Sequence, residues 1–221
     1  VEYRFTQMFR FGMFDHVRTP EPIPAQRDGA MARSIAEQGA VLLKNRGNLL
    51  PLDAKAIHSI AIIGPDAGTA MTGGGGSSHV EPLYTVTPVD GIKRHVGAHV
   101  MVTYNDGNDA ATAALVAKAA DVVLVMVGNK DREGRDRPNL SLPGHQDALV
   151  STVAAANPKT IVILKTGGAV LMPWLARVPS VLEVWYPGEE DGNVVADLVF
   201  GGTNPSGKLP LTFPKTETEV P

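Results

Sequence analysis

The loop from Glu133 to Arg137 carries the side chain of this sequence that is best placed to transfer a proton. It reads Glu-Gly-Arg-Asp-Arg and follows residues 121–128, an apolar stretch with the pattern of a buried strand. In open α/β sheets, ligands bind beyond the carboxyl ends of the strands, and a carboxyl group held there can serve as a general acid or base. We therefore expect Glu133, before any other residue, to be functional. The competing interpretation is a solvated surface charge, since most glutamates are exposed.

The charges around Glu133 act on its pKa in opposite directions. A general acid needs a raised pKa, which the nearby carboxylates of Asp131 and Asp136 favour. Three arginines within four residues of Glu133 favour a lowered pKa. The sequence leaves open which effect dominates.

Composition excludes several classes of protein. The 221-residue chain has a formal net charge of −3, an apolar fraction of 43% and no cysteine. Without cysteine, a disulfide scaffold, thiol catalysis and a zinc–thiolate site are excluded. No long basic run occurs, so we expect neither nucleic acid nor a membrane as a partner. No apolar run reaches the ~18 residues that a membrane span requires.

Two glycine-rich segments resemble phosphate-binding loops and fail on inspection. Gly202–Lys208 matches the first part of a P-loop, but Leu209 stands where Ser or Thr is needed. Thr72–Ser78 has Ser78 where a dinucleotide loop needs its last glycine. The second segment is either a flexible surface loop or a hydroxyl-bearing wall of a ligand site. The six histidines accompany no carboxylate cluster with ligand spacing, so we expect no metal and no cofactor.

The elements that must position Glu133 follow an alternating pattern. Apolar strands alternate with helical segments, which implies βαβ units and a mainly parallel sheet covered on both faces. The expected strands are residues 59–65, 99–104, 121–127, 160–164 and 181–186. The expected helices are residues 28–44, 110–120, 142–156 and 188–200. Before them, residues 1–14 read as a short apolar helix that stops at Gly12, and Pro20, Pro22 and Pro24 as a stiff extended linker.

Four blocks, in order, carry a resemblance to a known family. They are Gly39–Asn45 with Leu50–Leu52; Ile60–Pro65 with Gly73–Ser78 and Thr87–Ile92; Glu133–Arg137 through Leu142–Gln146; and Trp185–Gly188 with Asn204–Pro214. Together they resemble the C-terminal α/β-sandwich domain of glycoside hydrolase family 3. Residues 8–15 resemble the end of the barrel domain that precedes it in that family.

The resemblance implies a fold and a division of the chain. The expected fold is α/β, a three-layer α/β/α sandwich with a sheet of about six strands, mainly parallel and mixed at one edge. Residues 1–27 would be a linker and tail from a preceding barrel domain, residues 28–214 the sandwich domain, and residues 215–221 the start of a further linker. The chain lacks an initiator Met and a signal-peptide pattern, so we expect a mature fragment or an excised domain.

The resemblance also implies an activity. Members of the family are exo-acting retaining glycosidases, most often β-glucosidases, which need a nucleophile and an acid/base. In the family the nucleophile is an aspartate of the barrel and the acid/base is a glutamate of the sandwich, at the position of Glu133. The expected partners are a β-linked glucoside or oligosaccharide and the protein's own (β/α)8 barrel. The chain alone is expected to be inactive.

Further residues are assigned supporting roles. Ser77, Ser78 and Arg132 are expected to contact substrate, the serines on its aglycone side. Asp136 and Arg137 are expected to pair with each other and brace the loop. Trp174 and Trp185 can stack on sugars, although the strand pattern around Trp185 favours a core position.

Other functions remain open on the sequence. The runner-up is a non-catalytic carbohydrate-binding or interaction module of the same architecture. A nucleotide-binding α/β domain is a third reading, which the failed glycine motifs argue against. The sequence does not distinguish glucose, xylose and N-acetylglucosamine, and glucose is the expectation from the family. The compartment is not assigned; only the extracellular location of polymeric glycans favours a periplasmic or secreted protein.

Overall fold

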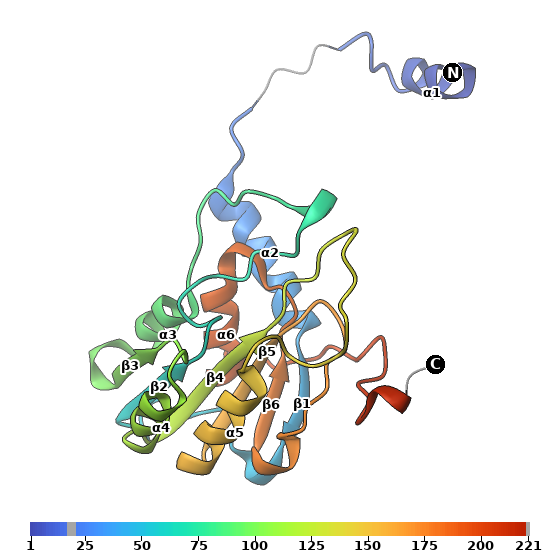
Figure 1. The fold of residues 1–221 in the computed structure, drawn as a ribbon. Coiled ribbons are helices and arrows are strands. Elements are labelled where there is room, and N and C mark those ends of the chain that lie inside the picture. Colours follow the sequence, from blue (N-terminus) through green and yellow to red (C-terminus); the bar gives the residue numbers. More distant parts are fainter. Residues whose placement is uncertain (17–20, 220–221) are drawn as a thin grey trace.

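A six-stranded sheet forms the centre of the molecule. The computed structural model describes residues 1–16 and 21–219. Within them the strand order is β1-β6-β5-β4-β2-β3 (Figure 1). The strands are β1 (Val41–Asn45), β2 (Ser59–Ile63), β3 (Met101–Asn105), β4 (Val122–Gly128), β5 (Thr160–Lys165) and β6 (Ser180–Glu183). Only the β1–β6 pair is antiparallel, which confirms the mainly parallel sheet that is mixed at one edge.

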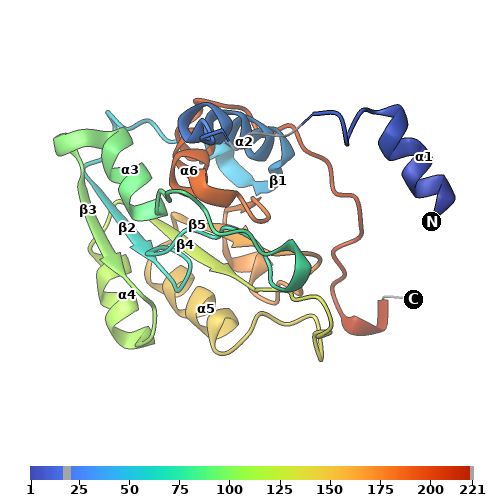
Figure 2. The same ribbon diagram turned by 90° about the horizontal axis from the view of Figure 1, so that it is seen from above.

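Helices cover both faces of this sheet, as its apolar strands require. They are α1 (Glu2–Arg10), α2 (Ala25–Gly39), α3 (Pro88–Val96), α4 (Ala110–Lys118), α5 (Gln146–Ala156) and α6 (Asp191–Phe200). Figure 2 shows α2, α3 and α6 on one face and α4 and α5 on the other. Every residue of β4 and β5 is buried, as expected for parallel strands covered on both sides. The three-layer sandwich is therefore confirmed.

Short polar signals set the helix ends. The hydroxyl of Thr87 accepts a hydrogen bond from the backbone N–H of Asp90 at the start of α3, and Asp109 caps α4 in the same way. Gly201, with a φ of 79°, ends α6. Single 3₁₀ turns occupy Arg46–Asn48, Gly76–Ser78, Gly97–His99, Leu175–Arg177, Gly188–Glu190 and Glu217–Glu219.

Three of the expected elements have the largest boundary errors. The helix expected over 28–44 ends at Gly39, and Val41–Asn45 forms the antiparallel edge strand β1 because it pairs with β6. The strand expected over 181–186 ends at Glu183, since Trp185 adopts a φ of 56°. Helix α5 begins at Gln146 rather than Leu142, because Gly144 has a φ of 65° and breaks the helical path.

The N-terminal helix α1 buries none of its residues, and Figure 1 draws it apart from the sheet. Its aromatic side chains contact residue 14, with the ring centroids of Phe9 and Phe14 4.6 Å apart. Pro20, one of the three expected linker prolines, lies outside the described residues. The domain boundaries at residues 27 and 214 stay predictions. None of the helices in the described ranges is long and apolar enough to cross a membrane.

The order of the strands points to a candidate ligand-binding site at the carboxyl ends of β2 and β4. The chain leaves β2 toward α3 on one face, and leaves the adjacent β4 toward α5 on the other. The loops that follow these two strands therefore diverge at their carboxyl ends. Such a switch point in strand order is where open α/β sheets bind ligands.

Candidate active site

Two loops at this switch point are joined through their backbones. The glycine-rich loop, residues 73–78, follows β2, and the acidic loop, residues 129–137, follows β4. The N–H of Gly75 donates to the carbonyl of Asp131 at 3.0 Å, and the N–H of Glu133 donates to the carbonyl of Gly75 at 3.4 Å. Residues 132–135 form a tight turn closed by the N–H of Arg135 on the carbonyl of Arg132 at 3.1 Å. Gly134, with a φ of 74°, supplies the left-handed residue of that turn.

Glu133 lies at the tip of this turn and is held by the glycine-rich loop. Its Oε2 accepts a hydrogen bond of 2.8 Å from the backbone N–H of Ser77. Gly76 has a φ of 85°, and a Cβ added there would lie 2.5 Å from the Cβ of Glu133. Only glycine lets the two loops approach so closely. The glycine-rich segment therefore lies directly against Glu133, and its role as a wall of a ligand site stays a prediction.

The pKa of Glu133 is lowered. The cause is hydrogen bonding from the side chain and the backbone N–H of Ser77 to the carboxylate, which is fully exposed to solvent. The sequence left open whether the nearby carboxylates or the nearby arginines dominate the pKa of Glu133. Neither does, because the hydrogen bonds from Ser77 set the direction of the shift. In this arrangement Glu133 is a carboxylate that can accept a proton.

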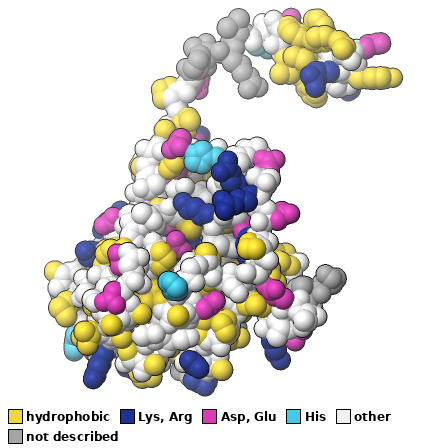
Figure 3. Space-filling view, in the orientation of Figure 1, with side chains coloured by type: hydrophobic (Ala, Val, Ile, Leu, Met, Phe, Trp, Pro, Cys, Tyr) yellow, Lys and Arg dark blue, Asp and Glu magenta, His cyan; other side chains and the backbone are white. Residues whose placement is uncertain are grey.

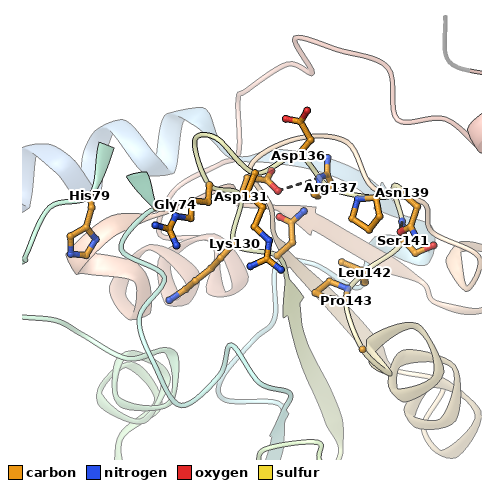
Figure 4. Close-up of a pocket in the computed structure, with 16 residues that line it drawn as sticks. Gly74, His79, Lys130, Asp131, Asp136, Arg137, Asn139, Ser141, Leu142 and Pro143 are labelled. Atoms are coloured by element: carbon orange, nitrogen blue, oxygen red, sulfur yellow. Dashed lines mark hydrogen bonds and ion pairs between the residues drawn. The ribbon is translucent and has the colours of Figure 1, made fainter. Parts of the chain in front are cut away.

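Asp131 organises the base of the acidic loop. Its backbone N–H donates to the Tyr186 hydroxyl at 2.8 Å, and its Oδ1 lies 3.2 Å from Nε of Arg137. Arg137 also donates to the carbonyl of Ala169 at 3.0 Å. The expected pairing of Arg137 with Asp136 is therefore wrong. Figure 4 shows Asp131 facing Arg137, while the carboxylate of Asp136 points away.

Two hollows flank the acidic loop. One, of about 460 Å³, is lined by Glu133 together with Ser77, Ser78 and Tyr186. The other, of about 850 Å³, adjoins it and is lined by residues from His79 to Pro143. Arg132, Arg135 and Arg137 are among the residues that border both. The structure thus brings Ser77, Ser78 and Arg132 to the same place as Glu133, and their substrate contacts stay predictions.

Sequence reasoning missed a buried ion pair beneath the glycine-rich loop. Lys165 and Asp191 are both fully buried, and Nζ of Lys165 lies 2.6 Å from Oδ2 of Asp191. The same oxygen accepts the N–H of Met71 at 2.8 Å, two residues before the glycine-rich loop. The signal in the sequence was a lysine at the end of an apolar strand, where an unpaired charge is costly.

A second buried acid, Glu183, was also missed. It is fully buried at the end of β6, and burial raises its pKa to about 8. Its Oε1 accepts the N–H groups of Trp185 at 2.8 Å and Thr166 at 3.3 Å. Its Oε2 lies 2.9 Å from the Thr166 hydroxyl, which has one hydrogen and also contacts the carbonyl of Gly168 at 2.7 Å. The hydroxyl can therefore donate to only one of these two oxygens at a time, and when Glu183 is protonated its carboxyl can donate to the hydroxyl instead.

The two tryptophans occupy different environments. Trp174 is fully buried and donates from its indole to Asp147 at 2.7 Å. Trp185 is half-buried, so the core position favoured for it is wrong, and its indole donates to the carbonyl of Gly39 at 3.0 Å. No group of three or more His, Asp or Glu side chains that could hold a metal ion occurs in the part of the chain that the structure describes.

The fold and this site define a parallel α/β-sandwich domain that presents a glutamate at its switch point. The family profile described as the glycosyl hydrolase family 3 C-terminal domain matches residues 40–221. The chain therefore belongs to glycoside hydrolase family 3, as the sequence motifs indicated.

Individual relatives agree with this assignment. The chain is 36% identical to a beta-xylosidase of Formosa agariphila, over 98% of this chain and 33% of that protein. It is 38% identical to the thermostable beta-glucosidase B of Acetivibrio thermocellus, over 83% of this chain and 26% of that protein. The structure of DesR, a beta-glucosidase from Streptomyces venezuelae, matches 96% of this chain and 42% of its own with a TM-score of 0.90 and 30% identity. The chain spans about a third or less of these two curated relatives.

Proposed function

We propose that this chain is the acid/base-bearing domain of a retaining exo-β-glycosidase, with a β-glucoside as substrate. Glu133 protonates the departing glycosidic oxygen and then activates the water that releases the sugar. The nucleophile is an aspartate of a barrel domain outside these 221 residues. The observation that carries the proposal is Glu133 itself, an exposed carboxylate fixed by Ser77 at the switch point of the sheet.

The geometry supports proton transfer in a defined position. Asp131, Arg137 and Tyr186 fix the base of the acidic loop, so the tip that carries Glu133 starts from a rigid support. The relatives named beta-glucosidase and beta-xylosidase support a β-glycoside as the substrate class. We choose glucose because a beta-glucosidase gives the structural match described above, with D-glucose bound in that structure.

The test uses the full-length protein that contains this chain and compares Glu133→Ala with the unaltered enzyme. General acid–base help is worth roughly 10²–10⁴-fold in rate, so hydrolysis of a cellobiose-type substrate should fall by that factor. A dinitrophenyl glucoside departs without protonation, so its first step should survive and the glycosyl-enzyme should accumulate. Azide needs no base and should restore turnover, giving a β-glycosyl azide.

Asp136→Ala is the matched control, because it removes an exposed carboxylate of the same loop that also borders the hollow, whereas its side chain points away from Arg137. It should retain the unaltered dependence on leaving group. If Glu133→Ala slows good and poor leaving groups equally and azide rescues neither, Glu133 is not the acid/base, and Asp131 becomes the next carboxylate to test. A full-length protein that binds β-glucosides without hydrolysing them would instead support the carbohydrate-binding alternative.

A further inference from the structure

The larger hollow beside the acidic loop carries an excess of positive charge. Four cationic residues line it against two anionic ones, in a chain whose net charge is −3. Arg137 is paired with Asp131. Within residues 1–16 and 21–219, the other three cations, Lys130, Arg132 and Arg135, form no ion pair.

The remaining charged groups at this hollow do not neutralise the three cations. His79, at one end of the hollow, contacts the carboxylate of Glu81 at 2.7 Å. In Figure 4 the side chain of Lys130 extends toward the side where His79 lies, whereas Asp136 is directed away. Figure 3 shows Lys and Arg side chains gathered beside a His on this face of the molecule. Like charges that line one hollow repel one another, and an anion that enters the hollow relieves the repulsion.

The position of the hollow says which part of a substrate would carry that anion. Under the proposed function, the Glu133 carboxyl contacts the glycosidic oxygen, the atom that joins the leaving group to the sugar. Arg132 is the residue next to Glu133 and borders both hollows. A leaving group that extends from the Glu133 side past Arg132 therefore enters the cationic hollow.

We propose that this enzyme prefers β-glycosides whose leaving group carries a negative charge, and that Lys130, Arg132 and Arg135 recognise it. The proposal rests on the function proposed above for Glu133. Guanidinium groups bind planar oxyanions through paired hydrogen bonds, while lysine supplies a point charge. The carboxylate of a uronic acid and the sulfate of a sulfated sugar share this chemistry.

The experiment measures kcat/KM of the full-length protein for three aryl β-glucosides of similar shape. Their 4-substituents are a carboxylate, a sulfonate and an uncharged carboxamide. We expect the charged substrates to be preferred over the carboxamide by on the order of tenfold, the size of one charge-assisted hydrogen bond. The preference should shrink as salt is added, since these side chains are exposed. A preference for one anion over the other separates a uronic-acid site from a sulfate site.

Variants test which side chains cause the preference for charged substrates. In Lys130→Met/Arg135→Gln the ratio of charged to uncharged kcat/KM should fall toward one. Lys118→Ala is the control, because it removes a cation at the end of α4. Lys118 lies next to the amino end of β4, whereas the hollow lies at the carboxyl end. Both changes affect exposed side chains, and thermal melting checks that the variants fold; if the double variant does not, each single substitution should lower the ratio.

Two failures are distinguishable. If the full-length protein hydrolyses none of the three glucosides, the proposed function falls and this inference with it. If it hydrolyses all three with equal kcat/KM, or keeps its preference after both charges are removed, the inference alone is overturned.

Discussion

Glu183 has no surface exposed to solvent and forms no ion pair within the described residues, and its raised pKa favours the protonated form. Replacing it with glutamine gives a direct test, because the glutamine side chain keeps a carbonyl oxygen for the N–H groups of Thr166 and Trp185. Its amide N–H replaces the acid proton that Glu183 donates to the Thr166 hydroxyl. The second amide hydrogen has no partner, which costs about 1–3 kcal/mol. We expect Glu183→Gln to be folded and moderately less stable than the unaltered chain at pH 5.

The dependence on pH is the sharper prediction. Burial raises the pKa of Glu183 from 4.5 in the unfolded chain to about 8 in the folded one. Between these values only the unfolded chain releases the proton, so the free energy of unfolding falls as the pH rises. Each pKa unit corresponds to about 1.4 kcal/mol, so the contribution of Glu183 declines by about 5 kcal/mol from below pH 4.5 to above pH 8. Glutamine does not titrate and removes this decline.

Urea unfolding of the 221-residue chain and its variant at pH 5, 6.5 and 8 measures the effect. The stability of the unaltered chain minus that of Glu183→Gln should fall by about 1.4 kcal/mol per pH unit, so that the variant becomes the more stable protein near pH 8. Glu21→Gln, at an exposed glutamate, should show a difference that does not change with pH. A difference for Glu183→Gln that is constant across this range would refute the protonated assignment.

Three further predictions concern the glycine-rich loop, its anchor and the isolated chain. Gly76→Ala places a Cβ 2.5 Å from that of Glu133 and should lower kcat/KM of the full-length protein by roughly 10²-fold, whereas Gly39→Ala, where an added Cβ meets nothing, should not. Lys165→Met leaves Asp191 buried without its partner and should lower the free energy of unfolding by about 3–5 kcal/mol, with most of it recovered when Asp191→Asn is added. The purified 221-residue chain should not hydrolyse aryl β-glucosides, and measurable turnover would contradict the two-domain site.

The strands could be predicted because runs of consecutive apolar residues indicate strands that are buried on both faces. Residues 122–127 are all apolar, and a run of this length is typical of a strand covered on both faces. Strand β1 could not be predicted in the same way. Val41, Leu42 and Leu43 continue the helical spacing of the residues before them, and it is the pairing of Val41 with Glu183 across the sheet that decides for a strand. Local pattern does not contain that contact.

The candidate site, too, could be predicted only where its features depend on local sequence. Glu133 stands out because its motif and its position after a strand are both local. The partner of Arg137 does not, since Asp131 and Asp136 are both close in sequence and only the turn at Gly134 brings Asp131 to it. Lys165 and Glu183 lie at the ends of apolar strands, where their type alone signals a buried charge but not its partner. Those partners, Asp191 and Thr166, are set by the order of the strands.

The lowered pKa of Glu133 constrains how the proposed reaction can work. A general acid is most effective with a pKa near the working pH, yet the hydrogen bonds from Ser77 stabilise the ionised form and solvent surrounds it. The upward shift must then come from groups that arrive with the substrate. A second carboxylate about 5 Å away, as retaining glycosidases have, disfavours ionisation, and a bound sugar removes water from the carboxyl group. When the nucleophile is consumed in the glycosyl-enzyme, that repulsion ends and Glu133 returns to the ionised form that a base requires. The Ser77 contact thus favours the second step, and the opposing domain favours the first.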